Sequence, residues 1–247
     1  MPRAKRLKSA TGLYHITDRG LNKEIIYPTA HDMRKMIEFT KEHAADYSVE
    51  FYAYCIMSNH FHFLLKVPFT QLLPFMQTIT STYATYYNSR YNRVGHVFQG
   101  RFHSECVENE PYYWCCVRYI HNNPLHAHMV NAPQRYTFSS IQEYMKPGDG
   151  LLHPHALKMY HNHYSSPDNF LLFHSQSDRH LFLDTPEEMQ LQKRRLVKAY
   201  LKEFLAEHPL LSEESILNSA KLKSSFIKEA SEKLAISMSA VKKIIDG

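Results

Sequence analysis

The sequence has no long apolar run. No stretch of its 247 residues approaches the roughly 20 consecutive apolar residues that a helix needs to cross a bilayer. The basic start of the chain leads into Ser9-Ala10-Thr11-Gly12 and not into the apolar region of a secretory signal peptide. We therefore expect a cytoplasmic protein that does not associate with a membrane.

Cysteines are few, and their spacing fits neither a zinc motif nor a disulfide framework. The chain has four, of which Cys115 and Cys116 are adjacent, and no two of them form a CxxC pair. This pattern is typical of reduced thiols.

Repeats and low-complexity tracts are also missing, and a composition of 44% hydrophobic and 21% charged residues excludes a disordered chain or a simple coiled coil. The chain is globular.

Acidic residues are missing from two long spans. No Asp or Glu occurs in residues 51–104 or 111–142. The chain has 29 basic and 24 acidic residues, and the whole excess of positive charge lies in residues 1–147. A region without acids repels no polyanion and offers no carboxylate cage for a metal, so it favours a phosphate-bearing partner. An aromatic-rich core that leaves little room for acids is the alternative explanation.

The order of strand and helix patterns predicts an α+β fold. Strand patterns occur in four stretches, at residues 13–17, 49–57, 60–67 and 101–107. Ser58-Asn59 predicts a tight hairpin turn between the second and third strands. Asp32 is expected to cap a helix after the first strand, and Asn109 with Pro111 a helix after the last. With another helix through Met76 and Ile79, this order is that of a ferredoxin-like antiparallel sheet with helices on one side.

The rest of the chain predicts a small all-helical C-terminal domain. A main domain is expected in residues 1–145, a linker or irregular segment in 146–185, and a helical DNA-binding appendage in 186–247. Residues 226–235 and 239–246 resemble a helix-turn-helix. Its expected core residues are Ala230, Leu234, Ile236, Val241 and Ile244, with Lys242 and Lys243 facing phosphate. A lysine-rich helix with a solvated face is the alternative.

Two histidines in the third predicted strand form a candidate metal site. His60 and His62 are two residues apart, so their side chains leave the same face of the sheet. Neutral imidazole is a common ligand of divalent ions such as Mn²⁺, Zn²⁺ or Ni²⁺. Because a metal site needs a third ligand, a pair of solvated or core histidines is the alternative.

A tyrosine and an asparagine near the end of the helix that starts near Pro111 offer further polar groups. Tyr119 and Asn123 are four residues apart and therefore share one helix face. A core aromatic residue and a helix C-cap are the alternative roles. Tyr112 and Tyr113 are rival tyrosines on the same helix. Two more HxH pairs, for which surface histidines are the favoured explanation, are formed by His153, His155, His161 and His163.

Four motifs occur in a fixed order, at residues 54–63, 87–102, 118–127 and 138–140. Together they resemble the REP-associated tyrosine transposases, single-tyrosine relatives of the small insertion-sequence transposases within the HUH nuclease superfamily. The resemblance covers about residues 12–145. The sequence departs from the family at Ser58, where Pro is common, and at residues 125–128, where Leu-His-Ala-His replaces Val-Arg-Ala-Gly and removes an arginine.

The resemblance implies a metal-dependent enzyme that nicks and joins single-stranded DNA, with hairpin-forming DNA as the substrate class. It implies that His60, His62 and Asn123 hold a divalent ion, Mg²⁺ or Mn²⁺, and that Tyr119 forms a covalent 5′-phosphotyrosine. Such an intermediate conserves the phosphodiester energy and allows rejoining without ATP. A domesticated, non-catalytic nucleic-acid-binding regulator and a hydrolase that uses water are the alternatives. The choice between monomer and homodimer stays open.

A basic and aromatic segment, residues 87–102, is the expected DNA contact. Its polar and basic candidates are Arg90, Arg93, His96, Gln99 and Arg101. They alternate with aromatic residues, a mixture that is typical of phosphate contacts combined with base stacking. Near the start of the chain, Arg3, Lys5 and Arg6 are further candidates.

Overall fold

The computed structural model describes residues 6–176, 181–182 and 186–246, and the chain divides into two compact units. Unit 1 comprises residues 1–176 and unit 2 residues 177–247. Each unit has its own hydrophobic core. Among the described residues, no helix combines the length and the apolar character that a membrane span requires.

Unit 1 is built on a four-stranded antiparallel sheet. Its strands are β1 (Leu13–Arg19), β2 (Glu50–Ile56), β3 (His60–Lys66) and β4 (His103–Cys106). They lie side by side in the order β2-β3-β1-β4. This is the strand order of a ferredoxin-like fold, in which two strand-helix-strand units interleave. The predicted fold class is confirmed.

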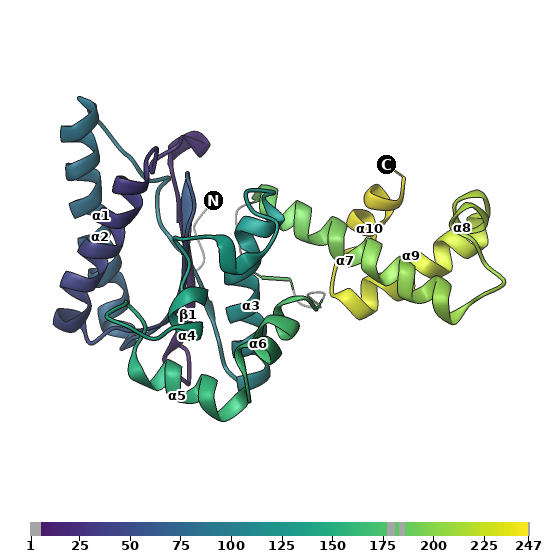
Figure 1. Ribbon diagram of the computed structural model, residues 1–247. Helices are drawn as coiled ribbons and strands as arrows, with labels where there is room; N and C mark the ends of the chain where they lie inside the picture. Colours follow the sequence, from purple (N-terminus) through teal and green to yellow (C-terminus); the bar gives the residue numbers. More distant parts are fainter. Residues whose placement is uncertain (1–5, 177–180, 183–185, 247) are drawn as a thin grey trace. The chain divides into compact units, whose positions relative to one another are not determined.

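Helices α1 (Ala30–Ala44) and α2 (Phe69–Tyr91) pack together on one face of the sheet (Figure 1). Alternate residues of the central strands, among them Ile16, Phe61 and Phe63, point toward these helices. They are fully buried and share one core with Met36 and Phe75. The period of two therefore leaves the intervening residues of β1 and β3 on the opposite face.

The first helix begins differently from the prediction. Thr29 is its N-cap, and Asp32 lies at the third helical position, where its Oδ2 accepts a hydrogen bond from the Thr29 N–H at 2.9 Å. Asp32 also accepts hydrogen bonds from the hydroxyls of Tyr86 and Tyr91 on α2, both at 2.8 Å. Burial opposes the charge of this carboxylate, but these hydrogen bonds outweigh it and lower the pKa of Asp32. Asp32 thus joins α1 to α2.

Helix α3 (Glu110–His126) covers part of the opposite face, against β2 and β3 (Figure 1). Asn109 is its N-cap, as predicted, and accepts a hydrogen bond from the Tyr112 N–H at 2.9 Å. The helix continues through Pro124 and ends in the cap residue Ala127. Asn123 is therefore inside the helix, not its C-cap, and shares a face with Tyr119.

The Phe-Ser-Ser motif at residues 138–140 links β2 to α3. The carbonyl of Phe138 accepts a hydrogen bond from the Ile56 N–H at 2.9 Å. Ser140 Oγ accepts one from the Tyr54 N–H at 2.8 Å and lies 2.9 Å from His121 Nε2 on α3. Residues 138–140, one of the four motifs of the sequence, therefore hold α3 at a fixed distance from the edge strand β2.

Residues 146–185 are not an irregular linker throughout. They contain α5 (Pro154–His163) and α6 (Pro167–His174), which follow the short α4 (Ile141–Met145). Both prolines occupy the first turn of a helix, where a missing N–H costs no hydrogen bond. Rings of Tyr144, Tyr160 and Phe170 pack together, with centroids 5.0 to 5.5 Å apart. The segment belongs to unit 1 as far as Gln176, and residues 177–180 and 183–185 lie outside the described residues.

A buried pair of histidines joins α6 to α3. His121 Nδ1 lies 2.9 Å from His174 Nε2, and His174 Nδ1 donates to the Phe170 carbonyl at 2.7 Å. Burial lowers the pKa of His174 to about 4, and burial together with His174 lowers the pKa of His121. Both rings are therefore neutral near pH 7, and the shared hydrogen bond requires a neutral ring on the accepting side.

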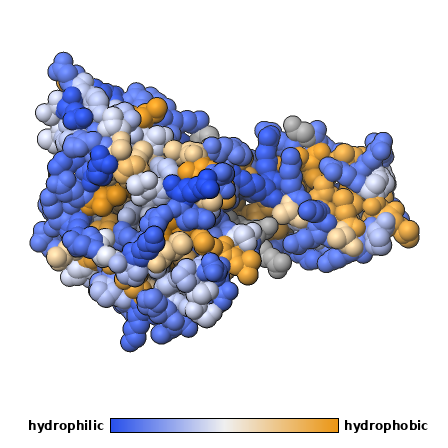
Figure 2. All heavy atoms as spheres, in the orientation of Figure 1, coloured by the Kyte–Doolittle hydropathy of each residue, from blue (hydrophilic) through white to orange (hydrophobic). Residues whose placement is uncertain are grey.

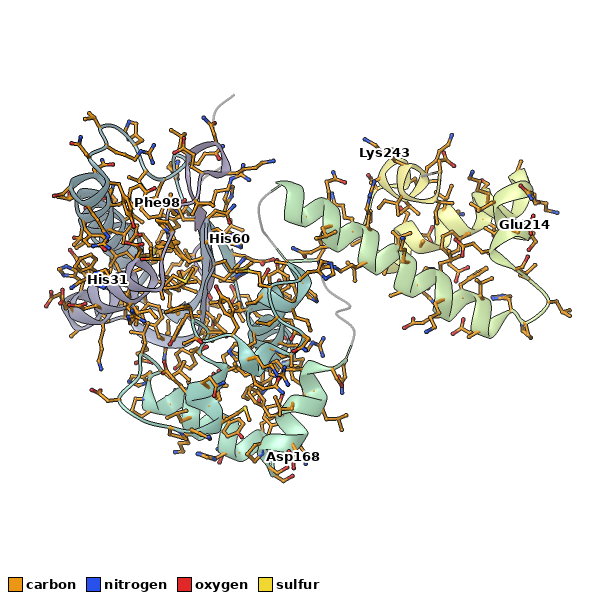
Figure 3. The ribbon with its side chains drawn as sticks, turned by 45° about the horizontal axis from the view of Figure 1, so that its top comes forward. His31, His60, Phe98, Asp168, Glu214 and Lys243 are labelled. Carbon is orange, nitrogen blue, oxygen red and sulfur yellow. The ribbon has the colours of Figure 1, made fainter. Side chains whose placement is uncertain are left out.

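The described part of unit 2 is all-helical, as predicted. It consists of α7 (Pro186–Glu207), α8 (Glu213–Asn218), α9 (Ala220–Leu234) and α10 (Met238–Ile245). Of the five expected core residues, Ala230, Ile236 and Val241 are buried, and the other two pack partly buried against them. Ala235, between α9 and α10, has a φ of +52°, the left-handed conformation of a tight interhelical turn. Lys243, labelled in Figure 3, is exposed on α10.

The buried carboxyl of Asp18, on the α1 and α2 side of β1, generates a prediction about pH. Burial raises the pKa of Asp18 to about 7, although Oδ1 accepts a hydrogen bond from the Arg19 N–H at 2.9 Å. A pKa raised from 3.8 means that this group removes stability as the pH rises from about 4 to 7, by about 4 kcal/mol in total. Because asparagine does not ionise, we expect Asp18→Asn not to lose this stability as the pH rises.

The measurement is the free energy of unfolding of both proteins in urea between pH 4 and 8.5. The advantage of Asp18→Asn over the wild type should grow up to about pH 7 and then become constant. A difference that is the same at every pH would contradict the shifted titration of Asp18.

Candidate active site

The face of the sheet that α3 covers carries three buried histidines, His15, His60 and His62, called the histidine cluster below. In β1 and β3 they alternate with core residues, so they leave the face opposite α1 and α2. Each is at most 3% exposed. The rings of His60 and His62 meet edge to face, with centroids 5.0 Å apart. Figure 3 shows His60 at the sheet, on the side away from the helix that carries His31.

The hairpin turn before β3 orients His60. Asn59 Oδ1 lies 2.7 Å from His60 Nδ1 and can only accept, so Nδ1 carries the proton. The turn itself is anchored, because the Asn59 carbonyl accepts a hydrogen bond from Gly20 N–H, and the Ser58 carbonyl from Ile26 and Tyr27. With Nδ1 protonated, the lone pair of His60 is on Nε2.

The Nε2 atoms of His60 and His62 share further features. Both atoms are buried, and neither forms a hydrogen bond in the described part of the chain. The Nδ1 atoms of both rings are engaged, in His60 by Asn59 and in His62 by His15. A metal-bound histidine usually has this arrangement, with one ring nitrogen on the metal and the other on a protein acceptor.

Tyr119 packs against the histidine cluster. Its ring is edge-on to His62, with centroids 5.7 Å apart, and edge-on to His15 at 5.9 Å. Asn123 lies one turn further along α3 and donates from Nδ2 to the Tyr119 carbonyl at 3.1 Å. The side-chain oxygen Oδ1 is then its remaining polar atom. Tyr119 is 2% exposed and Asn123 5% exposed, so both belong to a covered site.

The direction of α3 brings Asn123 toward His60. The first turn of α3 lies at the far end of β3, because Glu110 and Lys66 line one pocket of about 510 Å³. Between Tyr119 and Asn123 the helix rises about 6 Å, and His60 lies about 6.6 Å along the strand from His62. The pocket itself is lined by none of the four predicted site residues.

The rival tyrosines have other roles. The Tyr112 hydroxyl is hydrogen-bonded to Glu105, and burial followed by the charge of Glu105 raises the pKa of Tyr112. The Tyr113 hydroxyl lies 3.2 Å from that of Tyr144, and burial raises its pKa as well. Both phenols are harder to ionise than a free tyrosine, which disfavours them as nucleophiles.

The second group of histidines contributes to helix capping and packing. His153 Nδ1 accepts a hydrogen bond from the His155 N–H at 3.3 Å at the start of α5, and His155 lies 2.9 Å from the Tyr52 hydroxyl. His163 stacks on Trp114, with centroids 4.8 Å apart. Within the described residues, no three His, Cys, Asp or Glu side chains cluster as a metal site. A metal at His60 and His62 would therefore need a ligand of another type, such as an amide oxygen.

The basic segment, residues 87–102, runs from the end of α2 toward β4. Arg90 Nε lies 3.4 Å from Asp32 Oδ1, and Arg93 Nη2 lies 2.7 Å from Glu24 Oε2. His96, Gln99 and Arg101 are exposed. Of the N-terminal candidates, Arg6 stacks on the Phe102 ring at 3.9 Å, while Arg3 and Lys5 lie outside the described residues. The two arginines thus have ion-pair partners within unit 1.

Polar residues of β1 were missed by the sequence analysis. In the β1–β3 ladder Thr17 is opposite His62 and Arg19 is opposite His60. Both side chains therefore project from the sheet toward the side of α3, beside the histidines. Arg19 donates from Nε to Gln99 at 2.9 Å, which connects the basic segment to this strand. The signal was the polar residue at every second position of β1, where a strand buried on both faces would be apolar.

Comparisons with known proteins found one matching family model and a similar solved structure. Residues 13–123 match the family model of the IS200-like transposases. Among solved structures, the chain is similar to a REP-associated tyrosine transposase bound to a REP hairpin. The TM-score is 0.51 at 19% sequence identity, and the match covers 60% of this chain and 87% of the other. At this identity the likeness shows the fold. No curated protein matches the chain.

Proposed function

We propose that the protein is a metal-dependent enzyme that nicks and joins single-stranded DNA, since residues 13–123 match the family model of the IS200-like transposases. Tyr119 is the proposed nucleophile, and hairpin-forming DNA the proposed substrate. The observation that carries the proposal is the edge-on packing of Tyr119 against His62, beside His60. These three side chains come from a helix and a strand that are far apart in the sequence.

His60, His62 and Asn123 are the proposed ligands of a divalent ion, through the two Nε2 atoms and Oδ1. The engaged Nδ1 atoms and the buried Nε2 atoms fit this role. Mixed nitrogen and oxygen ligands suit Mn²⁺, and Mg²⁺ is the alternative. When bound, such an ion polarises a phosphate oxygen and eases departure of the 3′ oxygen.

Tyr119 acts on the phosphorus of the scissile phosphodiester. A bond forms between its Oη and phosphorus while the bond from phosphorus to the 3′ oxygen breaks. The phenol loses its proton, and the 3′ oxygen takes one up. The covalent 5′-phosphotyrosine keeps the strand on the protein until another 3′ hydroxyl attacks it. Tyr119 is 2% exposed as a whole residue, so we expect the groups around it to move when DNA binds.

The proposed DNA contacts combine the basic segment with the N-terminal Arg6. In support, hydrophilic residues cover most of the visible face of unit 1 (Figure 2), and a structure of similar fold is bound to a REP hairpin. In unit 2, Lys242 and Lys243 are exposed on the second helix of a helix-turn-helix-like pair, so we propose this unit as a further DNA-binding part.

The metal ligands generate the first test of this proposal. Replacing His62 by Ala removes one of three ligands, so we expect at least a tenfold loss of Mn²⁺ affinity by isothermal titration calorimetry and loss of metal-dependent cleavage. His161→Ala, which alters an exposed histidine of α5, is the matched control. Wild-type Mn²⁺ affinity in His62→Ala would remove this residue from the site.

The nucleophile is tested with labelled oligonucleotides. Wild-type protein, a hairpin strand and Mn²⁺ should give a covalent adduct that survives denaturation and contains only the fragment on the 3′ side of the cut. Tyr119→Phe removes only the hydroxyl, so it should bind the same strand and give no adduct. Tyr113→Phe, which alters a tyrosine of the same helix whose hydroxyl contacts Tyr144, is the control and should form the adduct.

The outcomes of this experiment separate the alternatives. An adduct that persists in Tyr119→Phe and disappears in Tyr112→Phe or Tyr113→Phe would move the nucleophile to that tyrosine. Cleavage without an adduct would identify a hydrolase that uses water. Tight binding by the wild type without cleavage would identify a non-catalytic regulator.

The basic segment is tested by the salt dependence of DNA binding. Replacing Arg90 and Arg93 together by Ala should reduce the slope of log affinity against log salt by up to about 1.4, at roughly 0.7 per phosphate of a single strand. Lys146 and Lys158, two exposed cations outside the segment, provide the control double variant. An unchanged slope in the arginine variant would place the DNA elsewhere.

A further inference from the structure

His62 contacts a second histidine on the neighbouring strand. His15 Nε2 lies 3.2 Å from His62 Nδ1, and the two rings stack with centroids 5.5 Å apart. The two residues are 1% and 0% exposed. Only one of the two facing nitrogens can carry a proton if both rings are neutral, so the position of the proton on His15 determines its position on His62.

A carboxylate lies on the other side of His15. Glu105 is directly opposite His15 in the β1–β4 ladder, and its Oε2 is 3.5 Å from His15 Nδ1. This contact is longer than a formed hydrogen bond, so the carboxylate acts on Nδ1 as a neighbouring negative charge. Such a charge favours the proton on Nδ1 of His15 and therefore the lone pair on Nε2.

Glu105 is itself held in position from α3. The Tyr112 hydroxyl is hydrogen-bonded to the Glu105 side chain. A tyrosine hydroxyl that meets a carboxylate donates its proton, which stabilises the charged form of Glu105. The hydrogen bond from Tyr112 therefore holds the charged carboxylate of Glu105 beside His15, although the Glu105 side chain is 26% exposed.

We propose that Glu105 and His15 are positioning residues that keep the proton of His62 on Nδ1 and thereby keep Nε2 open for the divalent ion. The path runs from the Glu105 carboxylate to His15 Nδ1–H, and from His15 Nε2 to His62 Nδ1–H. In the opposite tautomer, His15 would direct a lone pair at the carboxylate and His62 would carry its proton on the nitrogen needed for the metal. The inference rests on the proposed metal site.

His62 differs in this respect from His60. The Nδ1 proton of His60 is fixed by Asn59, whose oxygen can only accept. His15 can either donate or accept, so it has no fixed preference of its own, and the choice is left to Glu105. The structure therefore gives a specific role to a carboxylate that stands 43 positions from His62 in the sequence.

The first experiment measures Mn²⁺ affinity by isothermal titration calorimetry in the full-length protein. His15→Phe keeps a ring but removes the acceptor, and it should weaken Mn²⁺ binding by roughly 10- to 100-fold. His15→Gln restores an acceptor oxygen and should recover most of this loss. His161→Phe, on the exposed side of α5, is the matched control and should bind as the wild type does. A role in packing alone would leave His15→Gln no better than His15→Phe.

The second experiment observes the tautomer of His62 directly in the wild type. In the metal-free wild type labelled with ¹⁵N-histidine, long-range ¹H–¹⁵N correlations distinguish the two tautomers, and His62 should carry its proton on Nδ1. The signals are assigned by their loss in His62→Ala. A proton on Nε2, whether from the other tautomer or from a doubly protonated His15 that donates to His62, would overturn the inference.

These measurements also separate the inference from the proposed function. If His62→Ala binds Mn²⁺ as tightly as the wild type, the proposed metal site is wrong, whatever the tautomer. If metal binding requires His62 but a folded His15→Phe keeps wild-type affinity, the metal site stands and the role of His15 and Glu105 is wrong.

Discussion

The register between β1 and β3 is the constraint on which the site depends. Since side chains alternate across a strand, the pairing that directs Phe61 and Phe63 into the core also directs His60 and His62 toward α3. A slip by one residue would expose the phenylalanines to α3 and bury the histidines among apolar side chains. The turn at Ser58-Asn59, anchored by hydrogen bonds to residues 20–27, opposes such a slip.

Burying so many histidines requires a partner for each ring, since a buried polar group without one costs several kcal/mol. The fold supplies these partners in two chains of hydrogen bonds and contacts. One runs from Ser140 through His121 to His174 and holds α6 to α3. The other runs from Glu105 through His15 to His62. The first stabilises the helix that carries Tyr119, and the second lies directly beside it.

The basic segment combines a structural role with its proposed role in DNA binding. Arg93 neutralises Glu24 and Arg90 lies beside the buried Asp32, so both arginines stabilise unit 1 before any phosphate approaches. Exposed ion pairs such as that of Arg93 with Glu24 contribute little to stability, about 0 to 1 kcal/mol, and a phosphate can replace a carboxylate as the partner of an arginine. The buried Asp32 keeps its hydrogen bonds from Tyr86 and Tyr91 when Arg90 turns to a phosphate. The same side chains can therefore serve both roles without a large loss of stability.

Local patterns in the sequence determined the succession of strands and helices along the chain, the shared face of His60 and His62, the common face of Tyr119 and Asn123, and the cap at Asn109, because each depends on a period or spacing within a few residues. The prolines of residues 146–185 were ambiguous, since Pro occurs both in linkers and in first helical turns. Only the tertiary structure brought His15 and Glu105 to His62 and engaged Tyr112 with Glu105. These contacts join separate strands and a helix, and a single sequence has no periodicity that records which strands become neighbours.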